Sequence, residues 1–170
     1  TCALPIWCQK IAPECENCYA ETRDKQYHGG QHWGPNSTRK PMSENYWKQP
    51  EKWNTWARFG VCLECRGEGL VGSTIKEDDY KQPCPRCNGN GKVEPYRARV
   101  FCSSLADVFE DHEQLKQPRQ RLFSLISKTP HLDWLLLTKR PENILRLTRE
   151  AIDPFGHPDL DEIGEPNGLD

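Results

Sequence analysis

The alternation of apolar and amphipathic segments in the second half of the chain gives the clearest structural signal. The apolar runs at 98–103 and 132–138 predict two strands, and the second run is continuous enough for a parallel strand covered on both faces. Residues 118–128 and 141–150 each begin with proline and predict amphipathic helices. Their expected inward-facing residues are Leu122, Phe123, Leu125 and Ile126 in the first helix, and Ile144, Leu145 and Leu147 in the second. This strand–helix–strand–helix order predicts an α/β fold, as a barrel or an open sheet.

The first half of the chain predicts a helix followed by a loop. Residues 18–28 contain good helix formers, and Gly29 follows them as a stop signal. Residues 31–43 are rich in Gly, Pro, Asn and Ser and predict a loop. Arg39 and Lys40 within this loop are expected to be solvated rather than to form a binding site.

Residues 44–58 predict a helix that is broken or restarted at Pro50. One face of this helix would carry Trp47, Pro50, Trp53 and Ala57. The tryptophans alternate with lysines and could stack on nucleotide bases. Burial of the tryptophans against a sheet is the stronger interpretation of the same pattern.

The composition narrows the class of protein. Hydrophobic residues make up 35% of the chain and the mean hydropathy is −0.86, which predicts a small or split core. The net charge of −2 excludes a global basic field that would attract nucleic acid or membrane. No apolar run is long enough to span a bilayer, and the start lacks a secretory signal. Seven of the nine cysteines fall in metal-ligand spacings, which favours a reducing cytoplasm over a disulfide framework.

A repeated motif, C-x2-C-x-G-x-G, occurs at 62–69 and again at 84–91. Paired C-x2-C motifs at this separation predict a zinc site, whose ligands would be Cys62, Cys65, Cys84 and Cys87. Four thiolates complete a tetrahedron and leave no position for a substrate, so the predicted site is structural. The two repeats resemble the cysteine-rich zinc domain of DnaJ-type chaperones.

A second cysteine group has the spacing C-x6-C-x2-C and consists of Cys8, Cys15 and Cys18, with Tyr19 directly after it. Three thiolates are one too few for a closed zinc tetrahedron. They suit a cubane iron–sulfur cluster in which one iron remains open to another ligand. The alternative is a zinc site with a fourth ligand from elsewhere, for example His28, His32 or Cys102.

Polar residues follow both predicted strands of the second half. Asp107 comes after the first strand, and Lys139 and Arg140 come after the second, just before a predicted helix. Catalytic residues of α/β folds usually lie at the carboxyl ends of the strands. A helix N-terminus can bind a carboxylate or a phosphate group. Taken singly, Asp107 could cap a turn and Arg140 could form a surface ion pair. As a group facing a cluster, they are candidate catalytic residues.

The stretch C-x-K-I-x-P-x-C-x-N-C-Y-A-E at 8–21 resembles a phage-associated three-cysteine-motif family of unknown function, related to radical S-adenosylmethionine (SAM) enzymes. Segments 45–54, 97–111 and 133–144 extend this resemblance. It implies that Cys8, Cys15, Cys18 and Tyr19 bind a [4Fe–4S]-type cluster and SAM. Radical SAM enzymes usually use C-x3-C-x2-C, so the first loop is longer here.

These observations predict part of a radical-SAM-like TIM barrel with a small zinc-knuckle insert. Residues 1–60 and 96–150 would form the α/β domain, 61–95 the insert, and 151–170 a loop leading to a further C-terminal part. Because the sequence begins at Thr1 rather than Met, it is expected to be a fragment. One hypothesis is an iron–sulfur enzyme that uses SAM. The other is a non-catalytic zinc module that binds a partner protein or nucleic acid.

Overall fold

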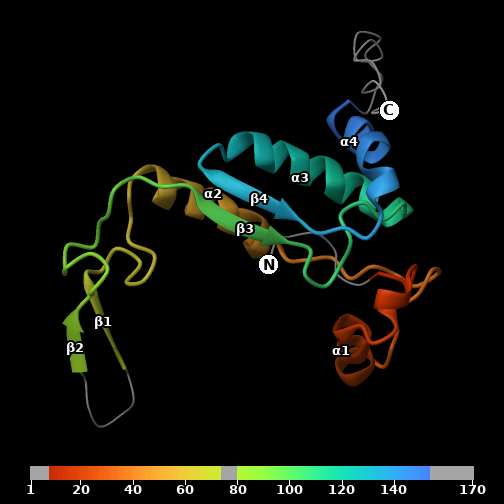
Figure 1. Cartoon of the computed structure of the whole chain (residues 1–170), viewed down its shortest axis with the longest axis horizontal. Coiled ribbons are helices and arrows are strands. Elements are labelled where there is room, and N and C mark those ends of the chain that lie inside the picture. The colour runs from red at the N-terminus through yellow and green to blue at the C-terminus, as the bar shows by residue number, and fades with distance from the viewer. Residues whose placement is uncertain (1–7, 74–79, 154–170) are drawn as a thin grey trace, which may run out of the picture. The chain divides into compact units, whose positions relative to one another are not determined.

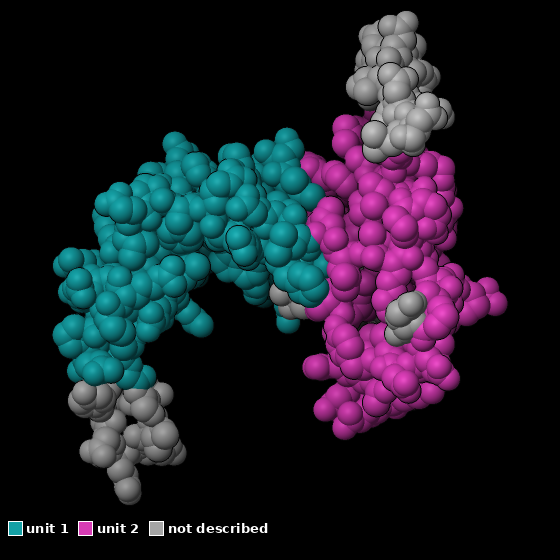
Figure 2. Space-filling model, in the orientation of Figure 1, with its two compact units in different colours: residues 1–3, 43–102, 125–135 teal, residues 4–42, 103–124, 136–170 magenta. Residues whose placement is uncertain are grey.

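The computed structural model describes residues 8–73 and 80–153, which form two compact units (Figure 2). The described elements include four α-helices and four short strands, and these strands form two separate two-stranded sheets. This content agrees with the predicted α/β class. In the same residues, no helix is long and apolar enough to cross a membrane. The described residues of unit 1 are 43–73, 80–102 and 125–135, and those of unit 2 are 8–42, 103–124 and 136–153.

In unit 1, helix α2, Glu44–Arg58, runs through Pro50 without a break (Figure 1), so the predicted interruption is wrong. Proline lacks an N–H group and removes one backbone hydrogen bond from the helix. Trp47, Pro50 and Ala57 are all buried and share one face of the helix. This face packs in the core of unit 1, where α2 contacts strand β3. Tertiary packing therefore offsets the lost hydrogen bond.

Strands β3, Ala98–Cys102, and β4, Leu132–Leu136, lie side by side and point in the same direction (Figure 1). The two strands are connected through helix α3, Lys116–Lys128, as expected for a parallel pair. The prediction that the second strand is covered on both faces is wrong, because Leu135 is 47% exposed. In β4, Leu132 is buried and the other residues are half-buried or exposed, so the described chain covers this strand only in part.

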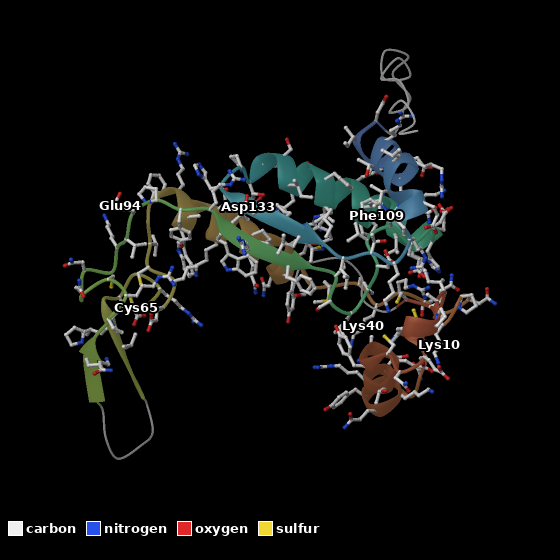
Figure 3. All side chains as sticks on the ribbon, in the orientation of Figure 1. Lys10, Lys40, Cys65, Glu94, Phe109 and Asp133 are labelled. Carbon is white, nitrogen blue, oxygen red and sulfur yellow. The ribbon has the colours of Figure 1, made fainter. Side chains whose placement is uncertain are left out.

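The zinc-motif segment of unit 1 contains strands β1, Leu70–Ser73, and β2, Tyr80–Pro83, which pair antiparallel. Its two ends are held together where Val61 forms an isolated bridge with Lys92. Figure 3 labels Cys65 inside this segment and Glu94 on the chain that leaves it. We call residues 61–93 the knuckle.

Unit 2 contains helices α1, Tyr19–His28, and α4, Ile144–Ile152, and the first part of α3. Helix α1 ends as predicted at Gly29, which has a left-handed φ of 65°. In α3, Leu122 and Leu125 are buried as predicted. Residues 154–170, which include most of the predicted terminal loop, lie outside the described residues.

The predicted inward face of α4 is only partly right. Leu147 is fully buried, whereas Leu145 is 67% exposed and Ile144 is 36% exposed. The buried side is formed by Leu147 and Ala151, which lie one turn apart. Leu145 is two positions from Leu147 and therefore projects from the opposite side of the helix.

Candidate metal centres

The two halves of the knuckle have the same backbone geometry, as their repeated sequence predicts. Residues 62–69 and 84–91 each place two cysteines before a reversal of the chain. The residue after the second cysteine is left-handed in both halves, with φ 54° at Arg66 and 49° at Asn88. Such values are uncommon outside glycine, so their recurrence indicates that both loops adopt the same tight knuckle.

Each loop is hydrogen-bonded to the other through its first cysteine. The Cys84 N–H donates to the Gly69 carbonyl at 2.8 Å, and the Cys62 N–H donates to the Gly91 carbonyl at 3.0 Å. These two bonds are equivalent under exchange of the repeats. They hold the two loops together so that the four cysteine side chains lie close to one another between them.

The four knuckle sulfurs all lie within 4.8 Å of one another, and all four residues are buried. The Sγ atoms of Cys62 and Cys84 are 3.8 Å apart, and those of Cys65 and Cys87 are 3.7 Å apart. A tetrahedral zinc ion with bonds of about 2.3 Å requires its sulfurs to stand about 3.8 Å apart. The measured spacing therefore fits one tetrahedral ion with four thiolate ligands.

Backbone N–H groups surround these sulfurs. Gly69 donates to the Sγ of Cys65, and Gly91 donates to the Sγ of Cys87, each at 3.2 Å. Such bonds orient thiolate ligands and stabilise their negative charge. A Cβ atom at Gly69 would also collide with the Gly89 carbonyl, so this position requires glycine.

The Cys62 and Cys84 thiols act as one coupled pair. Hydrogen bonds from the backbone of Cys65, together with that of Glu64, lower the pKa of Cys62 to about 7. Burial raises the pKa of Cys84 to about 11. Because the two sulfurs face each other in equivalent loops, the first proton leaves the pair easily and the second leaves with difficulty.

The three cysteines of the opening motif line a separate cavity, which lies within unit 2. This cavity encloses about 70 Å³ of accessible space, or about 490 Å³ when the open solvent at its mouth is included. It contains every residue that the sequence assigned to the second site: Cys8, Cys15, Cys18, Tyr19, Asp107, Lys139 and Arg140. The structure thus brings together residues from the start of the chain and residues that follow β3 and β4 in sequence.

Lys139 contacts the opening motif directly. Its Nζ donates to the Sγ of Cys15 at 3.4 Å, and Cys15 is buried at the end of the short 3₁₀ turn Pro13–Cys15. Burial acts to raise the pKa of Cys15, but hydrogen bonds from the backbone of Ile11 and Ala12 and from Lys139 lower it overall. The Cys15 thiol therefore loses its proton more readily than an ordinary cysteine, as a thiolate ligand must.

Cys8 lies in a different electrostatic environment. Burial, followed by the negative charge of Glu110, raises the pKa of Cys8 to about 12. A thiol of this kind ionises only when a positive centre compensates for the lost proton. Binding of a metal centre would supply that charge.

The three sulfurs of the opening motif are not gathered as closely as those of the knuckle. In the described part of the chain, Cys8, Cys15 and Cys18 do not all lie within 4.8 Å of one another, and no such group includes His28 or His32.

Asp107 and Arg140 contribute to the cavity mainly by holding it together. Arg140 donates to Asp107 at 2.7 Å, and both side chains are buried, so the expected surface ion pair is an internal one. Asp107 also accepts hydrogen bonds from the Thr138 hydroxyl at 2.7 Å and from the Lys139 backbone at 3.0 Å. This carboxylate therefore fixes the loop that carries Lys139.

The sequence did not predict that two further charged residues of unit 2 are buried. Arg39, expected to be solvated, is buried and forms a two-bond ion pair with Glu110. Arg119 is also buried and donates to the carbonyls of Val108 and Glu110. Arg140 approaches Glu110 at 3.5 Å and links this group to Asp107. Only tertiary contacts reveal this network, because its members are scattered along the sequence.

Tyr19 lies at the rim of the same cavity. Its hydroxyl donates to the backbone carbonyl of Ser104, and its ring remains largely exposed. The bond links the first turn of α1 to the loop after β3 in sequence. Trp33, which the sequence did not single out, also lines the cavity.

A family model described as "Protein of unknown function (DUF5131)" matches residues 5–161. The chain belongs to this family. The match covers both cysteine groups and the residues that line the unit 2 cavity. No curated protein and no solved structure matches the chain.

Proposed function

We propose that this protein is an iron–sulfur protein of the radical-SAM-like, phage-associated type, with a structural zinc ion in its knuckle. The proposal rests on one observation: three cysteines and Lys139 line a single cavity, and Lys139 donates to Cys15. Three thiolates suit a cluster with one open iron better than a zinc ion, which needs four ligands. The parallel β3–β4 pair suits a segment of a partial TIM barrel.

Cys8, Cys15 and Cys18 would hold the cluster, and the cluster with SAM would supply one-electron chemistry when bound. Lys139 stabilises the Cys15 thiolate and keeps further N–H donors that can bind a carboxylate. Arg140 is engaged with Asp107 and Glu110, so we assign it to positioning rather than to ligand binding. Tyr19 and Trp33 add aromatic surface to the lining of the cavity.

A second candidate function is a zinc-binding module that does no chemistry and binds a protein or nucleic acid. The complete tetrahedral spacing of the four knuckle sulfurs favours it. In that case the opening motif would also hold a metal of structural type. The two candidates differ in iron content and colour.

Anaerobic reconstitution with iron and sulfide tests the proposal. The expected product is brown, with a broad visible band from thiolate-bound iron. The band should disappear in Cys15→Ala and persist in Cys84→Ser, which should lose zinc instead. A reduced sample given SAM should release 5′-deoxyadenosine. A colourless protein with zinc at both sites would overturn the iron–sulfur assignment, and a brown protein that never cleaves SAM would remove the enzyme class.

A further inference from the structure

We propose that the C-terminal end of α2 and the base of the knuckle form a binding surface for single-stranded nucleic acid. We call this surface, made of Lys52, Trp56, Arg58, Phe59, Arg86 and Lys92, the aromatic–cation surface. It lies within unit 1 and is independent of any cluster in unit 2.

The surface combines one exposed ring, Phe59, and one half-buried ring, Trp56, with cations. The Lys52 ammonium lies 4.7 Å from the centre of the Trp56 ring, and the Arg58 guanidinium lies 5.2 Å from the centre of the Phe59 ring. Phe59 is 61% exposed although it sits at the end of a helix whose other face is buried. A large exposed aromatic beside an arginine provides the two contacts that bases and phosphates of a single strand require.

The base of the knuckle is fixed against this end of α2. The Val93 N–H donates to the Gly60 carbonyl at 2.7 Å, and the Tyr96 N–H donates to the Ala57 carbonyl at 3.1 Å. The Tyr96 hydroxyl donates to the Val61 carbonyl at 2.9 Å. A Cβ atom at Gly60 would collide with the Val93 carbonyl, so the two chains are as close as glycine allows.

These bonds place the cations of the knuckle beside the aromatic residues of α2. Lys92 is the bridge partner of Val61, which is only two residues from Phe59. Arg86 belongs to the second cysteine loop of the same knuckle. The surface therefore draws its cations from two segments, α2 and the knuckle.

The charges of this surface are not neutralised by acidic side chains. Within residues 8–73 and 80–153, no ion pair involves Lys52, Arg58, Arg86 or Lys92. On α1, by contrast, Lys25 forms an ion pair with Glu21. The net charge of the whole chain is −2, so attraction of a polyanion would have to come from local cations such as these. Unpaired cations beside exposed rings suit a polyanion that also carries flat apolar groups, which is a single-stranded nucleic acid.

Binding of a fluorescein-labelled oligothymidine to the full chain, followed by fluorescence anisotropy in low salt, tests this proposal. Phe59→Ala should raise Kd roughly 5-fold to 150-fold, the range expected for one lost stacking contact. Lys92→Ala should reduce the slope of log Kd against log salt by roughly 0.7, as expected for one lost phosphate contact on a single strand.

The matched control is Tyr27→Ala on α1. Tyr27 is 64% exposed and has the Arg23 guanidinium 5.7 Å from its ring centre, so it reproduces the same pair outside the proposed surface. Its replacement should leave Kd unchanged. Phe59→Tyr keeps a flat ring and should bind as the wild type does, and an unchanged circular dichroism spectrum of Phe59→Ala would exclude misfolding as the cause of its loss.

Three results would overturn the proposal: no binding by the wild-type chain in low salt, equal Kd for Phe59→Ala and wild type, or equal losses in Phe59→Ala and Tyr27→Ala. Tighter binding of a polyglutamate peptide than of the oligonucleotide would also overturn it, because the surface would then select charge without bases. The assay needs no iron. Its failure would therefore leave the iron–sulfur proposal intact, and loss of the cluster would leave this one intact.

Discussion

Arg39 and Glu110 form a buried, two-bond ion pair in unit 2, although 71 residues separate them in the sequence. The bonds are 2.9 Å from Nε to Oε2 and 2.8 Å from Nη2 to Oε1, and both side chains are almost completely excluded from solvent. The charge of Glu110 also acts on Cys8 and helps to raise its pKa. The pair therefore joins the loop after α1 to the segment after β3, whose Asp107 lines the cavity.

Replacing Arg39 with methionine should strongly destabilise the protein. The change leaves the Glu110 carboxylate buried without its two-bond partner, so we expect a loss of about 3–5 kcal/mol in the free energy of unfolding. Arg146→Met is the control, because Arg146 forms ion pairs with Asp111 and Glu150 that are largely exposed. Its cost should stay below about 1 kcal/mol. Urea denaturation of both variants measures the difference, and equal costs would contradict the assigned role of Arg39.

The double variant Arg39→Met, Glu110→Leu gives a second readout. It removes both charges, so no unpaired carboxylate remains in the interior. Much of the stability lost in Arg39→Met should return, because paired apolar replacements of buried ion pairs are often near neutral. If the double variant is as unstable as the single one, packing rather than charge explains the loss.

The sequence predicted well those features that short-range patterns control. The knuckle cysteines lie in two repeats, so their spacing alone predicted the four ligands that the structure brings together. Helix α1 ends at Gly29 because glycine readily adopts the left-handed conformation. In both cases the determining residues are neighbours in the chain.

The wrong predictions concern residues whose surroundings come from distant parts of the chain. Arg39 looked like a solvated loop residue because its partner, Glu110, lies far away in sequence. Pro50 looked like a helix break because the packing that retains the helix is tertiary. Leu145 looked buried because hydrophobicity alone does not say which side of α4 faces the core.

A methyl group added at Gly69 should disrupt the knuckle, because its Cβ would collide with the Gly89 carbonyl. Gly89→Ala is the matched control. Gly89 has a similar left-handed φ, +82° against +76°, but its Cβ would meet Pro83 at 3.5 Å and the Gly69 carbonyl oxygen at 3.9 Å, both ordinary contact distances. Both variants should pay about 1 kcal/mol for the left-handed conformation, and only Gly69→Ala should also lose zinc affinity. Metal titration measures this, and equal zinc affinities would show that the close contact between the loops is unimportant.

Removal of metal should unfold the knuckle while leaving the β3–β4 sheet in place. The buried cluster of the knuckle consists of its four cysteines, with only Val71 and Val93 packed against it. So small an apolar core cannot order the segment alone, whereas structural zinc contributes about 10–16 kcal/mol in comparable peptides.

Hydrogen exchange of the full chain measures the effect of metal removal. After chelation, or in Cys84→Ser, the amides of Cys62 and Cys84 should lose protection, because their bonds to Gly91 and Gly69 need both loops in place. The Ala98 amide, which donates to the His131 carbonyl in the core of unit 1, should stay protected. Protection of the knuckle amides without metal would contradict the structural role of zinc.

The zinc affinity of the knuckle should rise with pH. Zinc binds thiolates, so every remaining thiol proton must leave when the ion binds. With the pKa of Cys62 near 7 and that of Cys84 near 11, the pair keeps one proton across the range between these values. Displacement of this proton should increase the apparent affinity at least about tenfold for each pH unit between pH 7 and 9. Below the pKa of Cys62 a second proton must also be displaced, so the affinity should fall more steeply.

Chelator competition at a series of pH values measures this slope, with Cys15→Ala as a control that should reproduce it, because Cys15 belongs to unit 2. A flat profile above pH 7 would mean that both sulfurs are already thiolates in the metal-free protein, and that the paired loops stabilise two adjacent negative charges without an ion.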